Sequence, residues 1–156
     1  MLKYDIMLFI YNYIKKIISK LCSCKKPDTR FYYLSLMENI HAENGYTIHG
    51  LWPQYNSNSY PEFCKIVQFS MSDITTLKKD LEIYWKPPNM KDPMKLWRHE
   101  WKKHGSCIFT DVTQYEYFKI TLDLYKEVID KNIMCDKYKT GTHILIPVGL
   151  NFELLI

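Results

Sequence analysis

The order in which strand-like and helix-like segments follow one another limits the folds that this chain can adopt. Residues 31–37 (FYYLSLM) and residues 46–52 are rich in β-branched and aromatic side chains, which are typical of strands. Three helix-like segments follow, and residues 143–150 predict a further strand. Because strands and helices are grouped rather than alternating, this order favours an α+β fold with a mostly antiparallel sheet flanked by helices over an alternating parallel fold.

Residues that restrict the backbone mark the expected ends of these segments. Gly50 and Pro53 are expected to end the second strand, and the Asn-, Ser- and Tyr-rich residues 54–61 to form a loop. Ser72 predicts the N-cap of a first helix, which runs to about Trp85 along one apolar stripe.

The second and third helices carry the clearest end signals. Asp92 is a natural N-cap, Pro93 a natural first helical residue and Gly105 a natural terminator. Thr113 and Glu116 form a capping box that opens the third helix. The residues expected to face inward from it at helical spacing are Phe118, Leu122, Tyr125 and Ile129.

Length and composition are those of one folded domain that can bind a polyanion. The chain has 156 residues, 47% of them hydrophobic and 24% charged, with no repeat or low-complexity tract. The net charge of +4 attracts nucleic acid mildly, and many unrelated proteins are equally basic. The 13 tyrosines offer flat faces that suit stacking on bases, although most tyrosines in any protein simply pack. Composition therefore permits RNA binding without requiring it.

Residues 1–26 differ from the rest of the chain, which we assign to one domain over residues 27–156. The apolar run at residues 6–14 is too short, and too closely followed by lysines, for a typical membrane span. It partly resembles a signal-peptide core, but no small-x-small cleavage site follows it. A signal or anchor segment and a packed or loose amphipathic extension therefore both stay open.

The cysteines are odd in number, so they cannot all pair within one chain. Their spacing contains no pair of CxxC motifs, which argues against a zinc site made of four cysteines. The five are Cys22, Cys24, Cys64, Cys107 and Cys135.

Residues 96–104 (LWRHEWKKH) place an unusual set of polar side chains on one helix face. At about 100° per residue, four of them share one face within roughly two turns, and Trp101 falls on the other side. The four are His99, Glu100, Lys103 and His104. Two imidazoles, a carboxylate and an ammonium group are costly to bury and hard to explain as packing. A solvated charged face is the alternative interpretation.

The same segment does not fit a metal site. The pair His99-Glu100 begins like the HExxH zinc motif. Lys103 stands where the second histidine is required, and His104 comes one position too late. We therefore expect no metal and no other cofactor. A metal-dependent hydrolase that uses the same histidines is the rival interpretation, and activity in the presence of a chelator would exclude it.

Residues 47–54 (TIHGLWPQ) carry another histidine at the expected end of a strand. Alternation along a strand points Thr47 and His49 to one face and Ile48 to the other, and Gly50 then lets the chain turn. A single histidine in such a place is more often structural. Together with the helix cluster it supplies what a phosphodiester transfer needs: one imidazole accepts a proton, another donates one, and a cation stabilises the phosphorane.

The segments IHGLWP and HEWKKHGSC resemble the two active-site signatures of the T2 ribonuclease family, and the similarity extends in outline over residues 31–130. It implies a metal-independent endoribonuclease that cleaves single-stranded RNA by transesterification through a 2′,3′-cyclic phosphate. Low base specificity and no stable binding of DNA are implied too. The family further implies a secreted protein, or one in an endomembrane or lysosome-like compartment. A catalytically inactive relative that binds RNA or a protein partner is the alternative function.

The resemblance assigns roles position by position. His49 resembles the general acid that protonates the departing 5′ oxygen, and His104 resembles the base that takes the proton from the ribose 2′ hydroxyl. Glu100 and Lys103 resemble the pair that stabilises the pentacovalent intermediate. His99 resembles the histidine that holds the phosphate.

The resemblance also assigns residues that bind substrate and a disulfide. Trp52 resembles the aromatic platform for the base upstream of the cut, with Tyr60 as its partner. Gln54 is the third substrate-binding candidate, at a position where the family commonly has aspartate or a small polar residue. Cys64 and Cys107 resemble the disulfide that joins the two signature regions, a bridge that would hold acid and base in register.

Two further positions depart from the family pattern. Met37 stands where many members have a glutamine for the second base. Family members usually continue for dozens of residues past the equivalent of Cys135, whereas this sequence stops at Ile156. The domain is therefore expected to be C-terminally abbreviated relative to the family, as a natural minimal form, a fragment or a decayed copy. Base preference, the RNA target and the oligomeric state do not follow from the sequence.

Overall fold

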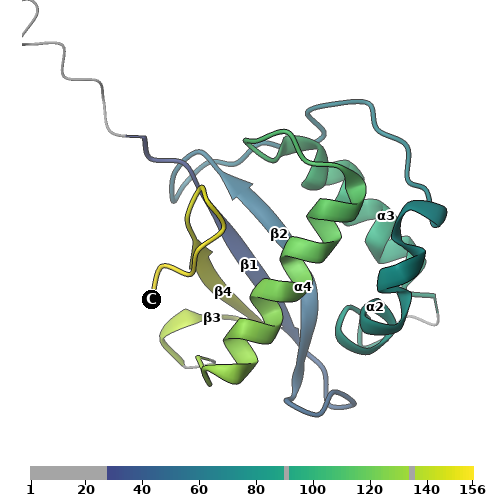
Figure 1. Cartoon of the computed structure of the whole chain (residues 1–156). Coiled ribbons are helices and arrows are strands. Elements are labelled where there is room, and N and C mark those ends of the chain that lie inside the picture. The colour runs from purple at the N-terminus through teal and green to yellow at the C-terminus, as the bar shows by residue number, and fades with distance from the viewer. Residues whose placement is uncertain (1–27, 90–91, 134–135) are drawn as a thin grey trace, which may run out of the picture.

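The computed structural model describes residues 28–89, 92–133 and 136–156. Within them, four strands form one antiparallel sheet in the order β2-β1-β4-β3 (Figure 1). The strands are β1 (Phe31–Glu38), β2 (Tyr46–Gln54), β3 (Lys139–Thr140) and β4 (His143–Val148). The predicted α+β class with a mostly antiparallel sheet is thus confirmed.

The helices lie on one face and one edge of this sheet. Helix α4 (Gln114–Asp130) crosses the face formed by β1 and β2, whereas α2 (Lys78–Tyr84) and α3 (Met94–Lys103) lie beside the β2 edge (Figure 1). Short 3₁₀ turns complete the fold in the described chain: η1 (Ser72–Leu77), η2 (Gly105–Cys107) and η3 (Asp136–Tyr138).

The capping box that opens α4 is confirmed, and the cap predicted at Ser72 is wrong. The Thr113 side chain accepts from the Glu116 backbone N–H, and the Glu116 carboxylate accepts from the Thr113 backbone N–H. Ser72 instead lies inside the 3₁₀ helix η1, whose N-cap is Met71, and its hydroxyl contacts Asp73 Oδ1 at 3.3 Å. Its side chain is used by a local polar contact, so it does not cap the helix.

The end signals of α3 act differently at its two ends. Asp92 Oδ1 accepts from the backbone N–H of Met94 at 3.0 Å, but the helix begins at Met94 with Pro93 as its N-cap, one residue later than predicted. Gly105 does not end α3 as a left-handed terminator, because it begins the 3₁₀ turn η2. A side chain at Gly105 would collide with the Trp101 ring, so close packing rather than backbone freedom requires glycine here.

Strand β2 continues through the residues that were expected to end it. It includes Gly50 and Pro53 and extends to Gln54. Pro53 is tolerated because β2 is an edge strand, where a missing N–H breaks no ladder on the open side. Ser35 pairs with Gly50 and Leu36 pairs with Ile48, so His49 is the extra residue of a β-bulge.

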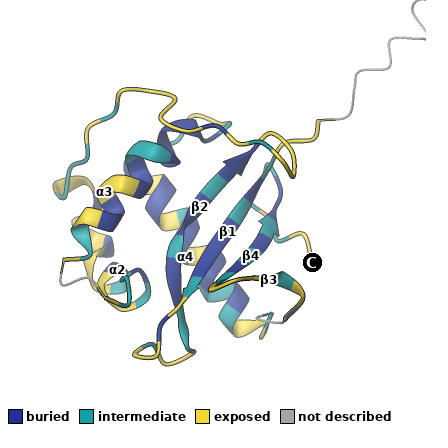
Figure 2. Ribbon diagram, turned by 180° about the vertical axis from the view of Figure 1, so that it is seen from behind, coloured by how far each residue is buried: buried dark blue, intermediate teal, exposed yellow. Residues whose placement is uncertain are grey.

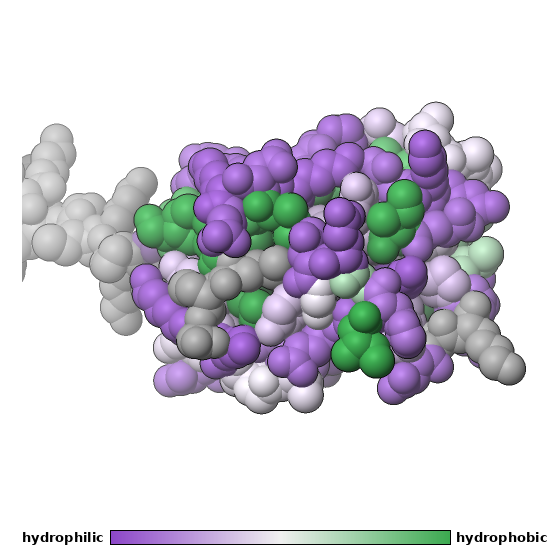
Figure 3. Space-filling model, turned by 90° about the horizontal axis from the view of Figure 1, so that it is seen from below, coloured by the Kyte–Doolittle hydropathy of each residue, from purple (hydrophilic) through white to green (hydrophobic). Residues whose placement is uncertain are grey.

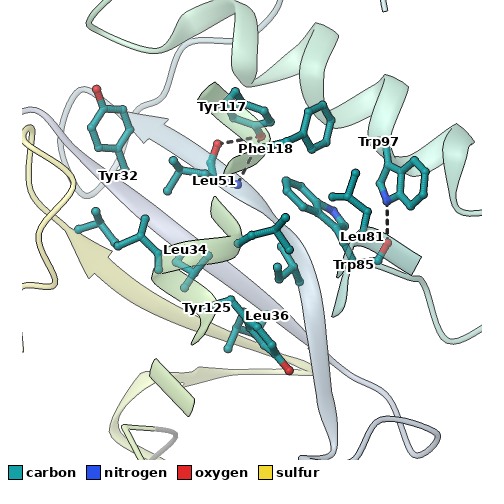
Figure 4. Close-up of a cluster of buried hydrophobic side chains, with 14 of the residues drawn as sticks. Tyr32, Leu34, Leu36, Leu51, Leu81, Trp85, Trp97, Tyr117, Phe118 and Tyr125 are labelled. Carbon is teal, nitrogen blue, oxygen red and sulfur yellow. Dashed lines mark hydrogen bonds between the residues drawn. The ribbon is translucent and has the colours of Figure 1, made fainter. Parts of the chain in front are cut away.

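The core combines aliphatic side chains with large aromatic ones, and it reaches directly to the strand that carries His49 (Figure 4). Trp97 Nε1 donates to the Trp85 carbonyl at 2.7 Å, and Trp85 Nε1 donates to the His49 carbonyl at 2.8 Å. Tyr117 contacts the Leu51 backbone through its hydroxyl. Half of the residues of β1, which lies between two other strands, are buried (Figure 2).

The surface shows no continuous apolar area on the side seen in Figure 3, where hydrophobic side chains form separate patches among hydrophilic ones. None of the helices in the described part of the chain has the length and apolar character needed to span a membrane. The N-terminal segment of residues 1–26, with its open alternatives, and the three cysteines Cys22, Cys24 and Cys135 lie outside the described residues.

We predict that Trp85→Phe lowers the free energy of unfolding by about 1–3 kcal/mol, because it removes the donor to a buried carbonyl while keeping most of the apolar volume. Chemical denaturation gives this value. Tyr125→Phe is the matched control, because it removes a hydroxyl that donates to the Tyr46 carbonyl at the far end of the same strand. In folded protein, only Trp85→Phe should change the imidazole NMR signals of His49, and a shift in both variants would contradict this account.

Candidate active site

One cavity of about 360 Å³ gathers every residue for which the sequence predicted a catalytic or substrate-binding role. It opens beside β2 and α3, the two elements that carry the signature segments. The lining residues are His49, Trp52, Gln54, Tyr60, His99, Glu100, Lys103 and His104. The structure brings these residues together.

The β-bulge explains how β2 presents two large side chains to the same cavity. In a regular strand, His49 and Trp52 are three positions apart and face opposite sides of the sheet. The extra residue at His49 shifts the alternation, and the two rings meet edge to face with centroids 5.0 Å apart. Because the bulge interrupts the strand at His49, the expectation of simple alternation through His49 is wrong.

The carboxyl group of Glu100 is the centre of the site. It is almost fully buried, with 1% of its surface exposed, and Trp52 Nε1 donates to its Oε2 at 2.9 Å. A side chain at position 50 would collide with this carboxyl group, so Gly50 is needed for the close approach of α3 to β2. The turn expected at Gly50 is therefore a close packing contact instead.

Two histidines flank this carboxyl group from different elements. His49 Nε2 lies 3.6 Å from Glu100 Oε1, and His104 Nε2 lies 4.0 Å from Glu100 Oε2. The His104 ring stacks on Trp52, with centroids 5.3 Å apart and planes at 29°. Within the described chain, His104 Nδ1 is buried without a hydrogen-bond partner. Both Nε2 atoms are thus held near one carboxyl group, and both histidines line the cavity.

Burial favours the uncharged form of all three groups. It raises the pKa of Glu100 to about 8, and the Trp52 indole and Lys103 only partly oppose this. Burial also lowers the pKa of His49 to about 4 and that of His104 to about 3, helped by the charge of Lys103. At neutral pH the contacts of the two histidines with Glu100 therefore join uncharged groups and are not ion pairs.

The remaining predicted residues form the rim. Lys103 Nζ lies 3.4 Å from the Glu62 carboxylate, and His99 is exposed, with its ring edge-on to Phe63. Tyr60 is 53% exposed. Gln54 is mostly buried, and its amide donates to the Trp52 carbonyl at 3.4 Å. The rim thus offers a cation, an imidazole and a phenol on the side open to solvent.

A disulfide between Cys64 and Cys107 fastens the loop after β2 to η2, the turn that follows α3, with Cα atoms 5.1 Å apart. The Phe63 backbone N–H donates to the Lys103 carbonyl at 2.9 Å, beside this bridge. The bridge implied by the family resemblance is therefore present, and it holds the rim of the cavity against the helix that carries the histidines.

His143 is a site neighbour that the sequence did not single out. Its Nε2 lies 2.9 Å from His49 Nδ1, and the two rings stack at 28° with centroids 5.1 Å apart. It begins β4 and pairs with Met37 of β1. Its place beside His49 depends on the pairing of β1 with both β2 and β4, which no local sequence signal reveals. Among the described residues, no group of three or more side chains has the arrangement that a metal ion requires.

The fold and the cavity together define an α+β protein in which a strand and a helix bring histidines, a carboxyl group and a lysine to one site. The chain belongs to the Ribonuclease T2 family, whose model matches residues 4–142. This match confirms the resemblance based on the two signature segments.

The similarity to individual relatives is moderate and covers part of their length. Ribonuclease DdI of Dictyostelium discoideum is 39% identical over 117 residues, which cover 65% of this chain and 52% of the relative. Ribonuclease 3 of Arabidopsis thaliana is 39% identical over 82 residues, which cover 49% of this chain and 36% of the relative. This chain therefore spans between about a third and about a half of the length of these relatives.

Solved structures show the same fold. Ribonuclease MC1 from the seeds of bitter gourd matches with a TM-score of 0.62 at 18% identity, over 80% of this chain and 92% of that chain. RNase NT in complex with 5′-AMP matches with a TM-score of 0.58 at 19% identity, over 82% of this chain and 90% of that chain. Identities this low establish the fold and nothing more.

We predict that Glu100→Gln is more stable than the wild type at about pH 9 and equally stable at about pH 4. The folded-state pKa of Glu100 is raised, so the stability that its protonation provides is present below its ordinary pKa of 4.5 and is lost as the pH rises through about 8. Glutamine stays neutral at all pH values and can still accept from the Trp52 indole. Thermal unfolding of both proteins across this range measures the difference.

Glu116→Gln is the control with the opposite sign. Hydrogen bonds from Thr113 lower the pKa of the Glu116 carboxyl group, so its stability contribution is present above pH 4.5 and is lost as the pH falls. This variant should be less stable than the wild type at high pH. A Glu100→Gln protein that loses stability at about pH 9 would show that the buried carboxylate is stabilised by its surroundings.

Proposed function

We propose that the protein is an endoribonuclease that cleaves single-stranded RNA by transesterification, without a metal ion, and leaves a 2′,3′-cyclic phosphate. The observation that carries this proposal is the placement of two histidine Nε2 atoms near opposite oxygens of one buried carboxyl group, His49 at 3.6 Å and His104 at 4.0 Å. Membership of the Ribonuclease T2 family supports it. The chain matches only part of the length of its relatives.

The first step needs one base and one acid on either side of a phosphate. In the proposed reaction, His104 accepts the proton of the ribose 2′ hydroxyl, whose oxygen attacks the adjacent phosphorus. The bond from phosphorus to the 5′ oxygen breaks, and His49 donates its Nε2 proton to that oxygen. Because the nucleophile belongs to the substrate, no metal is needed to generate hydroxide.

Negative charge that develops on the phosphorane is stabilised by the other two members of the cluster. Lys103 supplies a positive charge at the cavity. Burial raises the pKa of Glu100 to about 8, so at neutral and acidic pH its carboxyl group is protonated and can donate a hydrogen bond to a phosphoryl oxygen. Exposed His99 lies at the rim, where it can contact a phosphate of the bound strand.

The second step is the slower hydrolysis of the cyclic phosphate, with the two histidines in reversed roles. His49 then removes a proton from water, and His104 returns one to the 2′ oxygen. The proton balance of the cycle closes, because each histidine ends in the state in which it began.

Substrate binding is proposed to rest on stacking and charge more than on base edges. Trp52 and Tyr60 are aromatic side chains of the cavity, and every base has a face that can stack on them. Gln54 adds one amide near these rings, which fits low base specificity. The Cys64–Cys107 disulfide suits an oxidising compartment, so secretion or an endomembrane location is proposed.

The decisive experiment removes one oxygen from the substrate. In buffer with EDTA, an oligonucleotide with one deoxyribose immediately 5′ of the scissile bond should bind nearly as well as RNA but stay uncut. All-RNA substrate should give a cyclic phosphate that accumulates before it is hydrolysed. Cutting at the deoxy position, with no cyclic product at early times, would contradict the mechanism. Binding of RNA with no cutting at any pH would indicate the inactive relative.

His49→Ala and His104→Ala should each lower cleavage by roughly two to four orders of magnitude, the usual contribution of general acid–base catalysis. Their effects should not add fully in the double variant, because both serve one step. His41→Ala is the matched control, since this histidine is exposed in the β1–β2 turn and should leave cleavage unchanged.

We predict a bell-shaped pH profile of kcat/KM with its maximum well below pH 6.5. The base must be neutral and the acid protonated, and burial lowers the pKa of both histidines from 6.5, to about 3 for His104 and about 4 for His49. The profile should fall on the acid side as His104 gains a proton and on the alkaline side as His49 is left without one. Lys103→Gln, which removes a positive charge that lowers both pKa values, should move the maximum to higher pH. A maximum above pH 7 would contradict this assignment.

A further inference from the structure

His49 lies between two cavities, and its two ring nitrogens face different partners. Nε2 faces Glu100 and the cavity described above, whereas Nδ1 is 2.9 Å from Nε2 of His143. On the His143 side lies a second cavity of about 630 Å³, which His49, His143 and Thr142 line together. His143 is half-buried there, so its ring connects His49 with a face of the molecule that is separate from the proposed reaction site.

We propose that His143 is a positioning residue that hydrogen-bonds His49 Nδ1, fixes the ring and supplies the proton that His49 takes up at Nδ1 as it releases one from Nε2. The proposal rests on the proposed function, because it needs His49 to act as the general acid. It requires no group beyond the two imidazoles and solvent.

The proton transfer balances atom by atom. Before cleavage, charged His143 donates from Nε2 to Nδ1 of a neutral His49, whose own proton is on Nε2 and faces the substrate. When that proton moves to the 5′ oxygen, the proton shared with His143 moves to His49 Nδ1. Both imidazoles are then neutral, and the positive charge of His143 has been used to protonate the leaving group. Hydrolysis of the cyclic phosphate runs the same two transfers backwards.

The surroundings of the two rings favour this division of charge. His49 is deeply placed, and burial together with Lys103, His99 and the charge of His143 lowers its pKa. His143 lies further out, and its Nδ1 is 3.3 Å from the hydroxyl of Thr142.

The charged and titratable groups around the pair come from three elements. From β1, Glu38 lines the second cavity beside His143, and from β3, Lys139 pairs with Ile144, the next residue of β4. The groups that line the first cavity with His49 lie on α3 or directly after it: His99, Glu100, Lys103 and His104. A proton on His143 disfavours a second proton on His49, because the charge of His143 lowers the pKa of His49.

The test compares His143→Gln with the wild type in the pH profile of cleavage. Glutamine can still hydrogen-bond His49 Nδ1 but cannot carry a proton. We expect kcat/KM to fall by roughly 10- to 100-fold, within the range of general acid catalysis. The alkaline limb should also move, because the variant lacks the second imidazole whose charge acts on His49. Affinity for the uncut deoxy oligonucleotide should be unchanged. An unchanged profile would overturn the proposal.

A substrate with sulfur in place of the 5′ bridging oxygen gives a second measurement that folding defects do not mimic. A thiolate leaves without protonation, so His143→Gln and His49→Ala should both cut it nearly as fast as the wild type. His143→Asn should behave like His143→Gln, and the exposed His41→Gln should match the wild type on both substrates. A His143→Gln protein that stays slow on the sulfur substrate would show a structural role and overturn the proposal.

These measurements distinguish a failure of the proposed ribonuclease function from a failure of the proposed role of His143. The proposed function fails if the wild type makes no cyclic phosphate, or if His49→Ala cuts ordinary RNA normally. The role of His143 fails by itself if the wild type and His49→Ala behave as predicted while His143→Gln keeps full activity and an unshifted profile.

Discussion

The Glu100 carboxyl group occupies space that residue 50 leaves open by having no side chain, and it accepts a hydrogen bond from the Trp52 indole at 2.9 Å. Helix α3 can approach strand β2 this closely only with glycine at position 50. The same contact buries the carboxyl group, raises its pKa to about 8 and sets how far apart the two flanking histidines lie. The packing of the Glu100 carboxyl group against Gly50 therefore determines both the distance between β2 and α3 and the protonation state of the site.

Buried core residues stabilise this contact between α3 and β2. Trp97 belongs to the same helix as Glu100, and its indole donates to the Trp85 carbonyl (Figure 4). The Trp85 indole donates in turn to the His49 carbonyl. Two buried tryptophans thus connect the helix and the strand that form the cavity. The Cys64–Cys107 disulfide secures the opposite end of α3 to the loop after β2. Because α3 is held at both ends, the catalytic candidates that it carries keep the geometry that acid–base chemistry needs.

The parts of the site that depend on local geometry could be predicted from the sequence. The helical period alone puts Glu100, Lys103 and His104 on one face, because a helix is defined by contacts within four residues. The bulge at His49 could not be predicted, since it depends on how β2 pairs with β1. His143 is 94 residues from His49, and only the register of three strands brings their rings together. Pairing of this kind is decided by the whole sheet, so a local pattern cannot reveal it.

The low pKa values of the histidines give substrate binding an electrostatic consequence. His49 and His104 share a cavity with Lys103, so at neutral pH each added proton would place a second positive charge in a poorly solvated space. A phosphodiester carries one negative charge, and its arrival would offset the positive charge of Lys103 and raise both pKa values. By linkage, an anion that raises these values binds more tightly at lower pH, because it binds together with a proton. In the proposed reaction the negative charge of the substrate phosphate therefore favours the protonated form of the general acid His49. Binding of RNA itself thus promotes the protonation that cleavage requires.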